Sequence, residues 1–143
     1  MRKIITVSSD DVESRTSALK ILSSLFSETS EFEEIWRDWG TDSWGWFKIN
    51  GITIFVSTTG SDAASFKKNI EYIQKYDCSI GVMAAPKSAA AATDEIEIEH
   101  FDMDKYKKSI KNSAKDSTEA KNRIVASALF TKICCDYGVI PVV

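Results

Sequence analysis

The chain has 143 residues, of which 43% are hydrophobic and 27% are charged, with only 6 glycines and 2 prolines. These figures suit one globular domain over residues 1–143 with a single core, and they exclude a collagen-like or Gly/Pro-rich disordered chain. The formal net charge is −3, and no apolar run approaches the roughly 18–20 residues that span a bilayer.

Charge is distributed unevenly along the chain. Residues 1–100 contain 10 Lys or Arg against 16 Asp or Glu, whereas residues 101–143 contain 8 against 5. The acidic part repels a nucleic-acid backbone. The basic stretch between Lys105 and Lys115 could attract one, but its pattern is more typical of a solvated loop and helix face. We therefore do not expect nucleic acid as a partner.

Signals for export are missing from the sequence. The N-terminal run Met1–Val7 is too short for the apolar core of a signal peptide. Three cysteines, two of them adjacent (Cys134 and Cys135), do not suggest a disulfide framework. We expect a cytoplasmic protein that does not associate with membranes.

The first third of the chain predicts a strand, a helix and an acidic segment. Lys3–Ser8 is a short β-branched run typical of a buried strand. Val12–Phe26 repeats apolar residues at three- and four-residue steps, which indicates an amphipathic helix, and Ser9-Asp10-Asp11 offers N-caps for it. Residues 27–43 are acidic and irregular, with a short helix expected around Glu31–Trp36.

The middle of the chain predicts a hairpin, a helix and a strand. Trp44–Ile49 and Ile52–Ser57 flank Asn50-Gly51, which is the two-residue turn signal of a β-hairpin. A helix is expected from Ala63 to about Tyr76, followed by a buried strand over Ser79–Ala85.

The last third is less regular. The small residues of Lys87–Thr93 leave a short helix and a loop both open, whereas Glu95–Glu99 alternates acidic and apolar residues like a half-exposed strand. Residues 102–116 are basic, and we expect them to form a mobile segment. Ser117–Tyr137 predicts the last long helix, and Val139–Val143 predicts a final strand.

Strands that alternate with helices predict an α/β fold: a three-layer domain with a mostly parallel sheet and one antiparallel hairpin strand. Ligands of such sheets bind beyond the carboxyl ends of the strands. The loops Ser8–Arg15, Ser57–Asp62 and Ala84–Ala90 follow the strands in this way, so we expect any site to lie among them.

The first of these loops lies where phosphate-binding loops occur, between a first strand and a first helix. The template G-x-x-x-x-G-K-[ST] binds phosphates through bare backbone amides, a lysine charge and a hydroxyl that holds Mg²⁺. On this template Thr16 supplies the hydroxyl and Arg15 replaces the lysine, while Ser9 and Ser14 stand where the glycines would be.

The order and spacing of elements over nearly the whole chain resemble small P-loop ATP-binding proteins of bacteria and their phages. The resemblance rests on the hairpin Phe47–Ile54, the loop Gly60-Ser61-Asp62 and the approach to the next strand, Lys75–Ile80. It implies a P-loop-NTPase-like domain whose nucleotide-facing positions are Ser9, Ser14, Arg15, Thr16, Gly60 and Asp62.

Departures from the motif predict a lost or much-altered nucleotide site. Asp10, Asp11 and Glu13 set three carboxylates against Arg15, and each costs about 2 kcal/mol beside a phosphate at ~6–8 Å and an effective dielectric of ~20. Serine at the glycine positions also resists the positive φ that such a loop requires. We expect no cofactor. The alternative is a nucleotide-binding protein, an NTPase or small kinase, that uses ATP or GTP with Mg²⁺ at this altered loop.

Other interpretations of the carboxylates remain open. Asp10, Asp11, Glu13 and Asp62 have the composition of a divalent-metal site, or Asp10 or Asp11 caps the first helix while the others complement its dipole. Asp10-Asp11 after a first strand also resembles response-regulator receivers. That family needs a phosphoacceptor aspartate at the end of the third strand, whereas the hairpin ends in Ser57-Thr58.

All four tryptophans lie within eleven residues, at Trp36, Trp39, Trp44 and Trp46. Trp44 and Trp46 share one face of a predicted strand, and large aromatic side chains are favoured at interfaces. Acidic neighbours oppose a base-stacking role. We expect these residues to form a surface for a protein partner or for self-association as a dimer, unless one or two of them complete the core.

No catalytic constellation is complete in the sequence. His100 is the only histidine, no adjacent serine or cysteine motif accompanies it, and the cysteines lack the spacing of a zinc site. The sequence therefore predicts a non-catalytic protein-binding module. We expect a pseudo-NTPase of the inhibitor or adaptor kind that phages and mobile elements encode.

Overall fold

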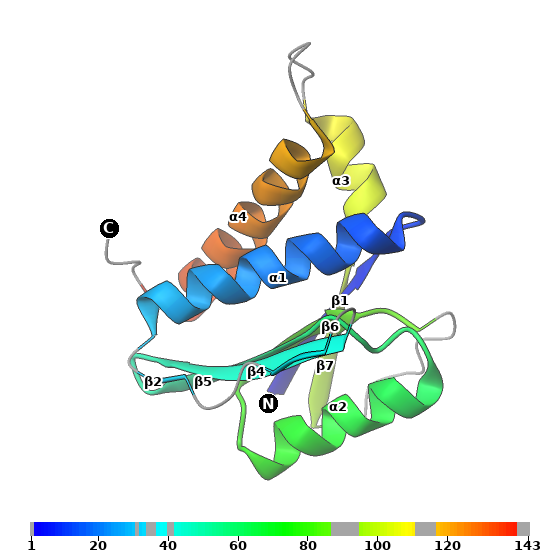
Figure 1. Ribbon diagram of the computed structural model, residues 1–143. Coiled ribbons are helices and arrows are strands. Elements are labelled where there is room, and N and C mark those ends of the chain that lie inside the picture. Colours follow the sequence, from blue (N-terminus) through cyan, green and yellow to red (C-terminus); the bar gives the residue numbers. More distant parts are fainter. Residues whose placement is uncertain are drawn as a thin grey trace.

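The computed structural model describes residues 2–30, 32–33, 37–39, 42–86, 95–110 and 117–139. A central sheet lies between two helical layers (Figure 1). One layer contains α1 (Val12–Thr29), α3 (Met103–Ser109) and α4 (Thr118–Asp136), and the other contains α2 (Ala63–Lys75).

The sheet is mostly parallel. Its seven described strands are β1 (Arg2–Ser8), β2 (Phe32–Glu33), β3 (Arg37–Trp39), β4 (Asp42–Ile49), β5 (Ile52–Ser57), β6 (Ile80–Ala84) and β7 (Ile96–Asp102). They are arranged in the order β2-β4-β5-β6-β1-β7, and β3 also pairs with β4. Strands β5, β6, β1 and β7 run parallel, whereas β4 is antiparallel to β5. The predicted α/β fold, with a mostly parallel sheet and one antiparallel hairpin strand, is confirmed.

The hairpin between β4 and β5 turns through the two residues that the sequence indicated. Asn50 has φ 49° and Gly51 has φ 76°. Positive φ at both central positions is the geometry of a type I′ turn, whose twist matches that of the paired strands.

Short polar side chains define where the helices begin. Each described helix follows a cap residue whose side chain accepts a hydrogen bond from the amide three residues later: Asp11, Asp62, Asp102 and Ser117. Such caps satisfy one of the orphan amides of a first helical turn. The predicted cap of the first helix is therefore Asp11.

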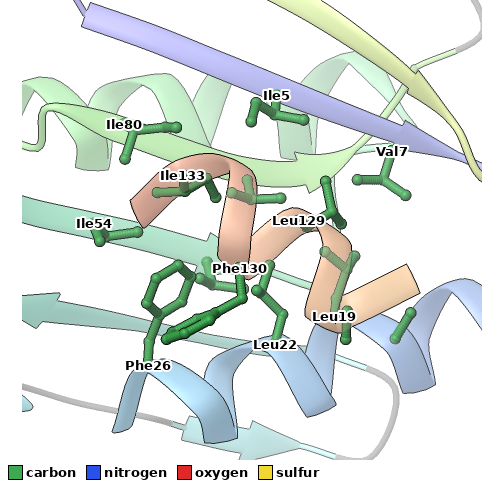
Figure 2. Close-up of a cluster of buried hydrophobic side chains, with 14 of the residues drawn as sticks. Ile5, Val7, Leu19, Leu22, Phe26, Ile54, Ile80, Leu129, Phe130 and Ile133 are labelled. Atoms are coloured by element: carbon green, nitrogen blue, oxygen red, sulfur yellow. The ribbon is translucent and has the colours of Figure 1, made fainter. Parts of the chain in front are cut away.

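The main core lies between the sheet and the layer of α1 and α4 (Figure 2). Phe26 of α1 links three elements of this core, because its ring lies 5.0 Å from that of Phe130 on α4 and 6.1 Å from that of Phe47 on β4. Aliphatic side chains from the sheet and from α1 and α4 make up much of the rest: Ile5, Val7, Leu19, Leu22, Ile54, Ile80, Leu129 and Ile133.

A second, smaller core fills the opposite face of the sheet under α2. Phe66 and Ile73 of α2 pack there against Ile4, Phe55 and Met83. A Cβ atom on Gly81 of β6 would lie 2.3 Å from Cδ1 of Ile73. The absence of a side chain at position 81 therefore lets α2 approach the sheet closely.

Several boundaries differ from the sequence predictions. The short helix expected around Glu31–Trp36 is wrong, because Phe32–Glu33 pairs with β4 as a strand. Residues 103–109, expected to lie in a mobile segment, form α3 after the cap by Asp102, and β7 extends to that cap. The expectations for Lys87–Thr93 and for a strand beyond Val139 lie outside the described residues.

None of the described helices combines the length and the apolar composition that a transmembrane segment requires.

Replacing Phe26 by alanine is expected to lower the free energy of unfolding by about 3–5 kcal/mol, because the truncation opens a cavity between α1, α4 and the sheet. Urea denaturation followed by circular dichroism measures this loss. The matched control is Ile124→Ala on α4, where the side chain is 38% exposed, and there the change should stay within about 0.5 kcal/mol. Equal effects of the two substitutions would contradict this core.

Candidate functional site

The loop between β1 and α1 is shorter than the phosphate-loop template requires. Helix α1 begins at Val12, so Ser14, Arg15 and Thr16 already lie in its first turns. Only Ser9, Asp10 and Asp11 remain between strand and helix. The six-residue loop that would wrap a phosphate is therefore replaced by a short turn.

The polar groups of this turn are bound by the protein's own carboxylates. The Ser9 hydroxyl donates to Oδ1 of Asp104 at 2.7 Å, and the Asp10 amide donates to Oδ2 of the same carboxylate at 2.7 Å. The amide and hydroxyl of Ser14 donate to the two carboxylate oxygens of Asp11, at 3.2 and 2.8 Å. The Asp11 amide donates to Ser9 Oγ at 3.1 Å. Asp104, which comes from α3, thus fills the position of an anion beside the first strand.

These contacts shift the titration of the carboxyl groups. Hydrogen bonds from the Asp10 amide and the Ser9 hydroxyl lower the pKa of Asp104 below its ordinary value. Hydrogen bonds from Ser14 lower the pKa of Asp11 in the same way. Both groups are held as carboxylates, so negative charge is built into the turn.

Lys107 supplies a nearby positive charge. Its Nζ donates to Oδ1 of Asn122 at 2.7 Å, which ties α3 to α4. Burial lowers the pKa of Lys107, while the charges of Asp11 and Asp104 raise it. The ammonium group therefore balances carboxylates that the protein already contains.

Arg15 and Thr16 lie on different sides of α1. Arg15 is only 8% exposed, its Nε finds no acceptor among the described residues, and burial lowers the pKa of its guanidinium. Thr16 instead lines a surface depression of about 420 Å³ with Val12 and Lys20, on the solvent side of the helix. The structure does not bring the two motif residues together over the turn.

The second predicted loop, Ser57–Asp62, packs against the end of β6. Gly60 has φ 128°, and a Cβ atom there would lie 2.7 Å from the carbonyl oxygen of Ala84. The carbonyl of Thr59 accepts from the Ala84 amide at 3.1 Å and from Nδ2 of Asn69 at 3.2 Å. Asp62 caps α2. Gly60 and Asp62 are thus placed by packing and by capping.

The proposed metal cluster does not assemble among the described residues. Asp11 and Asp62 cap different helices, and no described group of three or more His, Cys, Asp or Glu side chains is arranged to hold a metal ion.

The receiver interpretation is also wrong, because its strand order differs. Numbered along the chain, the parallel strands here lie in the order 2-3-1-4, whereas receivers share the flavodoxin-like order 2-1-3-4-5.

The tryptophans separate into different environments. Trp46 is 5% exposed and packs in the second core, with its ring 4.3 Å from that of Tyr76 and 5.4 Å from that of Phe55. Trp44 is half-buried at the edge of the same cluster. For Trp46 the core alternative is confirmed. Trp36 lies outside the described residues, as does the side chain of Trp39.

One contact was missed at the sequence level. His100 on β7 lies between two hydroxyl groups of β1, with its Nδ1 2.9 Å from Oγ1 of Thr6 and its Nε2 3.0 Å from Oγ of Ser8. The residues are more than 90 positions apart in sequence. The sequence indicated that Thr6 and Ser8 lie on one face of a strand. It did not indicate which strand pairs with them or in which register.

Comparisons with protein-family models, with curated proteins and with solved structures find no match to this chain. The function is therefore argued from the residues of the site.

Replacing Asp104 by asparagine is expected to lower the free energy of unfolding by about 1–2 kcal/mol at pH 7, because the amide group cannot accept from both Ser9 and Asp10. The pKa of Asp104 is lower in the folded chain. The contribution of this carboxylate to the free energy of unfolding is thus present above pH about 4, the ordinary pKa of aspartate. It is lost as the pH falls through the lower pKa that Asp104 has in the folded chain. Urea denaturation at pH 7 and pH 3 measures both effects.

The matched control is Asp10→Asn, because the Asp10 side chain accepts no hydrogen bond among the described residues. This change should stay within about 0.5 kcal/mol. An Asp104→Asn protein as stable as wild type at pH 7 would contradict the bridging role of the carboxylate.

Proposed function

We propose that this chain is a protein-binding module, a pseudo-NTPase that does not hydrolyse nucleotides. The observation that carries the proposal is made at the carboxylate of Asp104. It accepts hydrogen bonds from the Ser9 hydroxyl and from the Asp10 amide, at 2.7 Å each. These are the two groups that a phosphate would need at the end of β1. The amide of Ser14 donates to the Asp11 carboxylate. None of these three donors, the Ser9 hydroxyl and the amides of Asp10 and Ser14, is therefore left for a ligand.

Electrostatics supports the same proposal. A phosphate at the turn would approach Asp11 and Asp104, whose pKa values are both lowered by their hydrogen bonds. Each of these like charges would oppose a bound phosphate. Lys107 offsets part of this repulsion, but it already donates to Asn122.

The partner that we propose is a second copy of the chain. Trp44 is half-buried at the margin of the second core, and the neighbouring stretch of sequence contains two further tryptophans and a series of acidic residues. Aromatic side chains of this kind are favoured at interface centres, and a two-fold dimer is the commonest assembly of identical chains. An inhibitor or adaptor from a phage or mobile element is the biological setting that we propose for such a module.

A second candidate is a nucleotide-binding protein that uses Arg15 and Thr16. The observation in its favour is the buried guanidinium of Arg15, whose Nε finds no acceptor among the described residues. A bound anion would supply one. Thr16, however, lines a depression on the solvent side of α1 and would need to change its environment to reach the same anion.

We expect no binding of ATP–Mg²⁺ or GTP–Mg²⁺ below millimolar concentration and no release of inorganic phosphate, because the Ser9 hydroxyl and the amides of Asp10 and Ser14 already donate to carboxylates. Isothermal titration calorimetry and a phosphate-release assay measure these quantities. Sub-millimolar binding that is lost in Arg15→Gln and Thr16→Ala proteins would favour the nucleotide-binding candidate instead.

We expect sedimentation equilibrium to give a mass above the 15.9 kDa of one chain. Trp44→Ala should raise the dissociation constant of the dimer at least about tenfold, because buried aromatic residues dominate interface energies. The matched control is Val12→Ala on α1, an exposed apolar side chain of the helical layer, which should leave the constant unchanged. A monomer at all concentrations would contradict self-association.

A further inference from the structure

A pair of side chains at the carboxyl end of β1 is not used by the proposed protein-binding function. Ser8 is the last residue of β1, and His100 lies on the adjacent parallel strand β7. The Oγ of Ser8 is 3.0 Å from Nε2 of His100, and the Oγ1 of Thr6 is 2.9 Å from Nδ1 of the same ring. A hydroxyl, an imidazole and a third group on the far ring nitrogen form the arrangement of an activated nucleophile.

The contacts of Thr6 fit a ring proton on Nδ1 of His100, because the Thr6 hydroxyl has the carbonyl of Glu99 as its own acceptor. Thr6 is fully buried, and its hydroxyl donates to the carbonyl of Glu99 at 3.5 Å. Its oxygen is then the acceptor for the N–H at Nδ1 of His100. A neutral imidazole protonated at Nδ1 has its lone pair on Nε2, so the Ser8 hydroxyl donates to it. This is the tautomer that a general base needs.

Ser8 and His100 are accessible to solvent, and a backbone amide next to them is available as a hydrogen-bond donor. His100 is exposed and Ser8 is half-buried. The amide of Ser9, the residue directly after Ser8, has no hydrogen-bond partner among the described residues. The amide after a nucleophilic serine is a usual donor to the oxyanion that forms during acyl transfer. The pair also lies at the edge of the sheet where α/β proteins place their ligands.

From this geometry we propose that Ser8 is a nucleophile activated by His100, which attacks small uncharged carboxylic esters. The Ser8 oxygen bonds to the carbonyl carbon while its proton passes to Nε2 of His100. The tetrahedral intermediate then expels the alcohol, which takes that proton. Water, deprotonated by His100, hydrolyses the acyl-Ser8 ester to release the acid and restore the serine.

The chemical class of the substrate follows from the charges nearby. Asp10 and Asp102 flank this end of the two strands in sequence, and both are exposed. Their charge repels anionic esters. The exposed imidazole lies on β7, the last strand of the described sheet, and we expect it to take a small acyl group. Thr6 is a positioning residue, because it holds the ring of His100 and does not touch the substrate.

The experiment treats the full-length protein with a neutral fluorophosphonate ester, which leaves a stable adduct on an activated serine as fluoride departs. Peptide mass spectrometry locates the adduct, and p-nitrophenyl acetate gives the rate of acyl transfer. We expect the adduct on Ser8 and its loss in Ser8→Ala. His100→Gln should slow modification at least about 100-fold, the lower end of general-base effects.

Thr6→Val should slow modification about tenfold without changing the reagent concentration that gives half the maximal rate, and Thr6→Ser should restore the rate. Ser127→Ala, an exposed serine on α4 with no histidine partner, is the matched control and should react like wild type. No adduct in the wild-type protein, an adduct only on other residues, or an undiminished rate in His100→Gln would each overturn the proposal. None of these results depends on whether the chain binds a protein partner.

Discussion

The backbone amides and carbonyls of β1 need hydrogen-bond partners along both edges of the strand. The rest of the structure is arranged around that requirement. The strand pairs in parallel with β6 on one side and with β7 on the other. Its residues Ile4, Ile5 and Val7 are fully buried between the two helical layers. Since an unpaired buried peptide group is costly, neither neighbour can be removed without exposing or orphaning part of this strand. The carboxyl ends of three parallel strands therefore meet where β1 turns into α1.

Where these strand ends meet, a carboxylate side chain of the protein itself accepts the hydrogen bonds of the turn. Asp104 comes from the helix that follows β7, yet its two oxygens bind the turn that follows β1. One carboxylate thus joins the first and last strands of the parallel sheet at their ends. The same region holds Ser8 and His100, so the Asp104 contact also fixes the turn that follows the proposed nucleophile. The Asp104 contact and the proposed nucleophile thus share one edge of the sheet.

Much of the fold could be predicted because local signals and the fold agree. The Asn50-Gly51 turn, the Asp11 cap and the apolar period of α1 each act within a few residues, and each gave the element that the structure contains. Helix α3 was missed because it has only seven residues, of which just Met103 and Tyr106 pack on the main core. β2 was missed because only its pairing with β4 makes it a strand.

The candidate site was harder to predict than the fold, because its partners are distant in sequence. Asp104 was not among the expected residues, although it binds the turn that contains Ser9. The pairing of His100 with Ser8 depends on the register of β7 against β1, which no local pattern reports. Arg15 was expected at the end of a phosphate-facing loop, but α1 already begins at Val12. That Arg15 is buried while Thr16 lines a surface depression follows from how α1 packs on the sheet.

The pairing of β1 also constrains the order in which the chain is completed during synthesis. β1 is made before all the other described strands, yet both of its neighbours, β6 and β7, are made after the hairpin and α2. Until residue 102 has emerged, one edge of an apolar β-branched strand has no native partner. Parallel contacts of such high sequence separation form late because loop closure precedes any gain from pairing. The nascent chain is therefore exposed to misassembly at β1 until both of the strands that pair with it have been made.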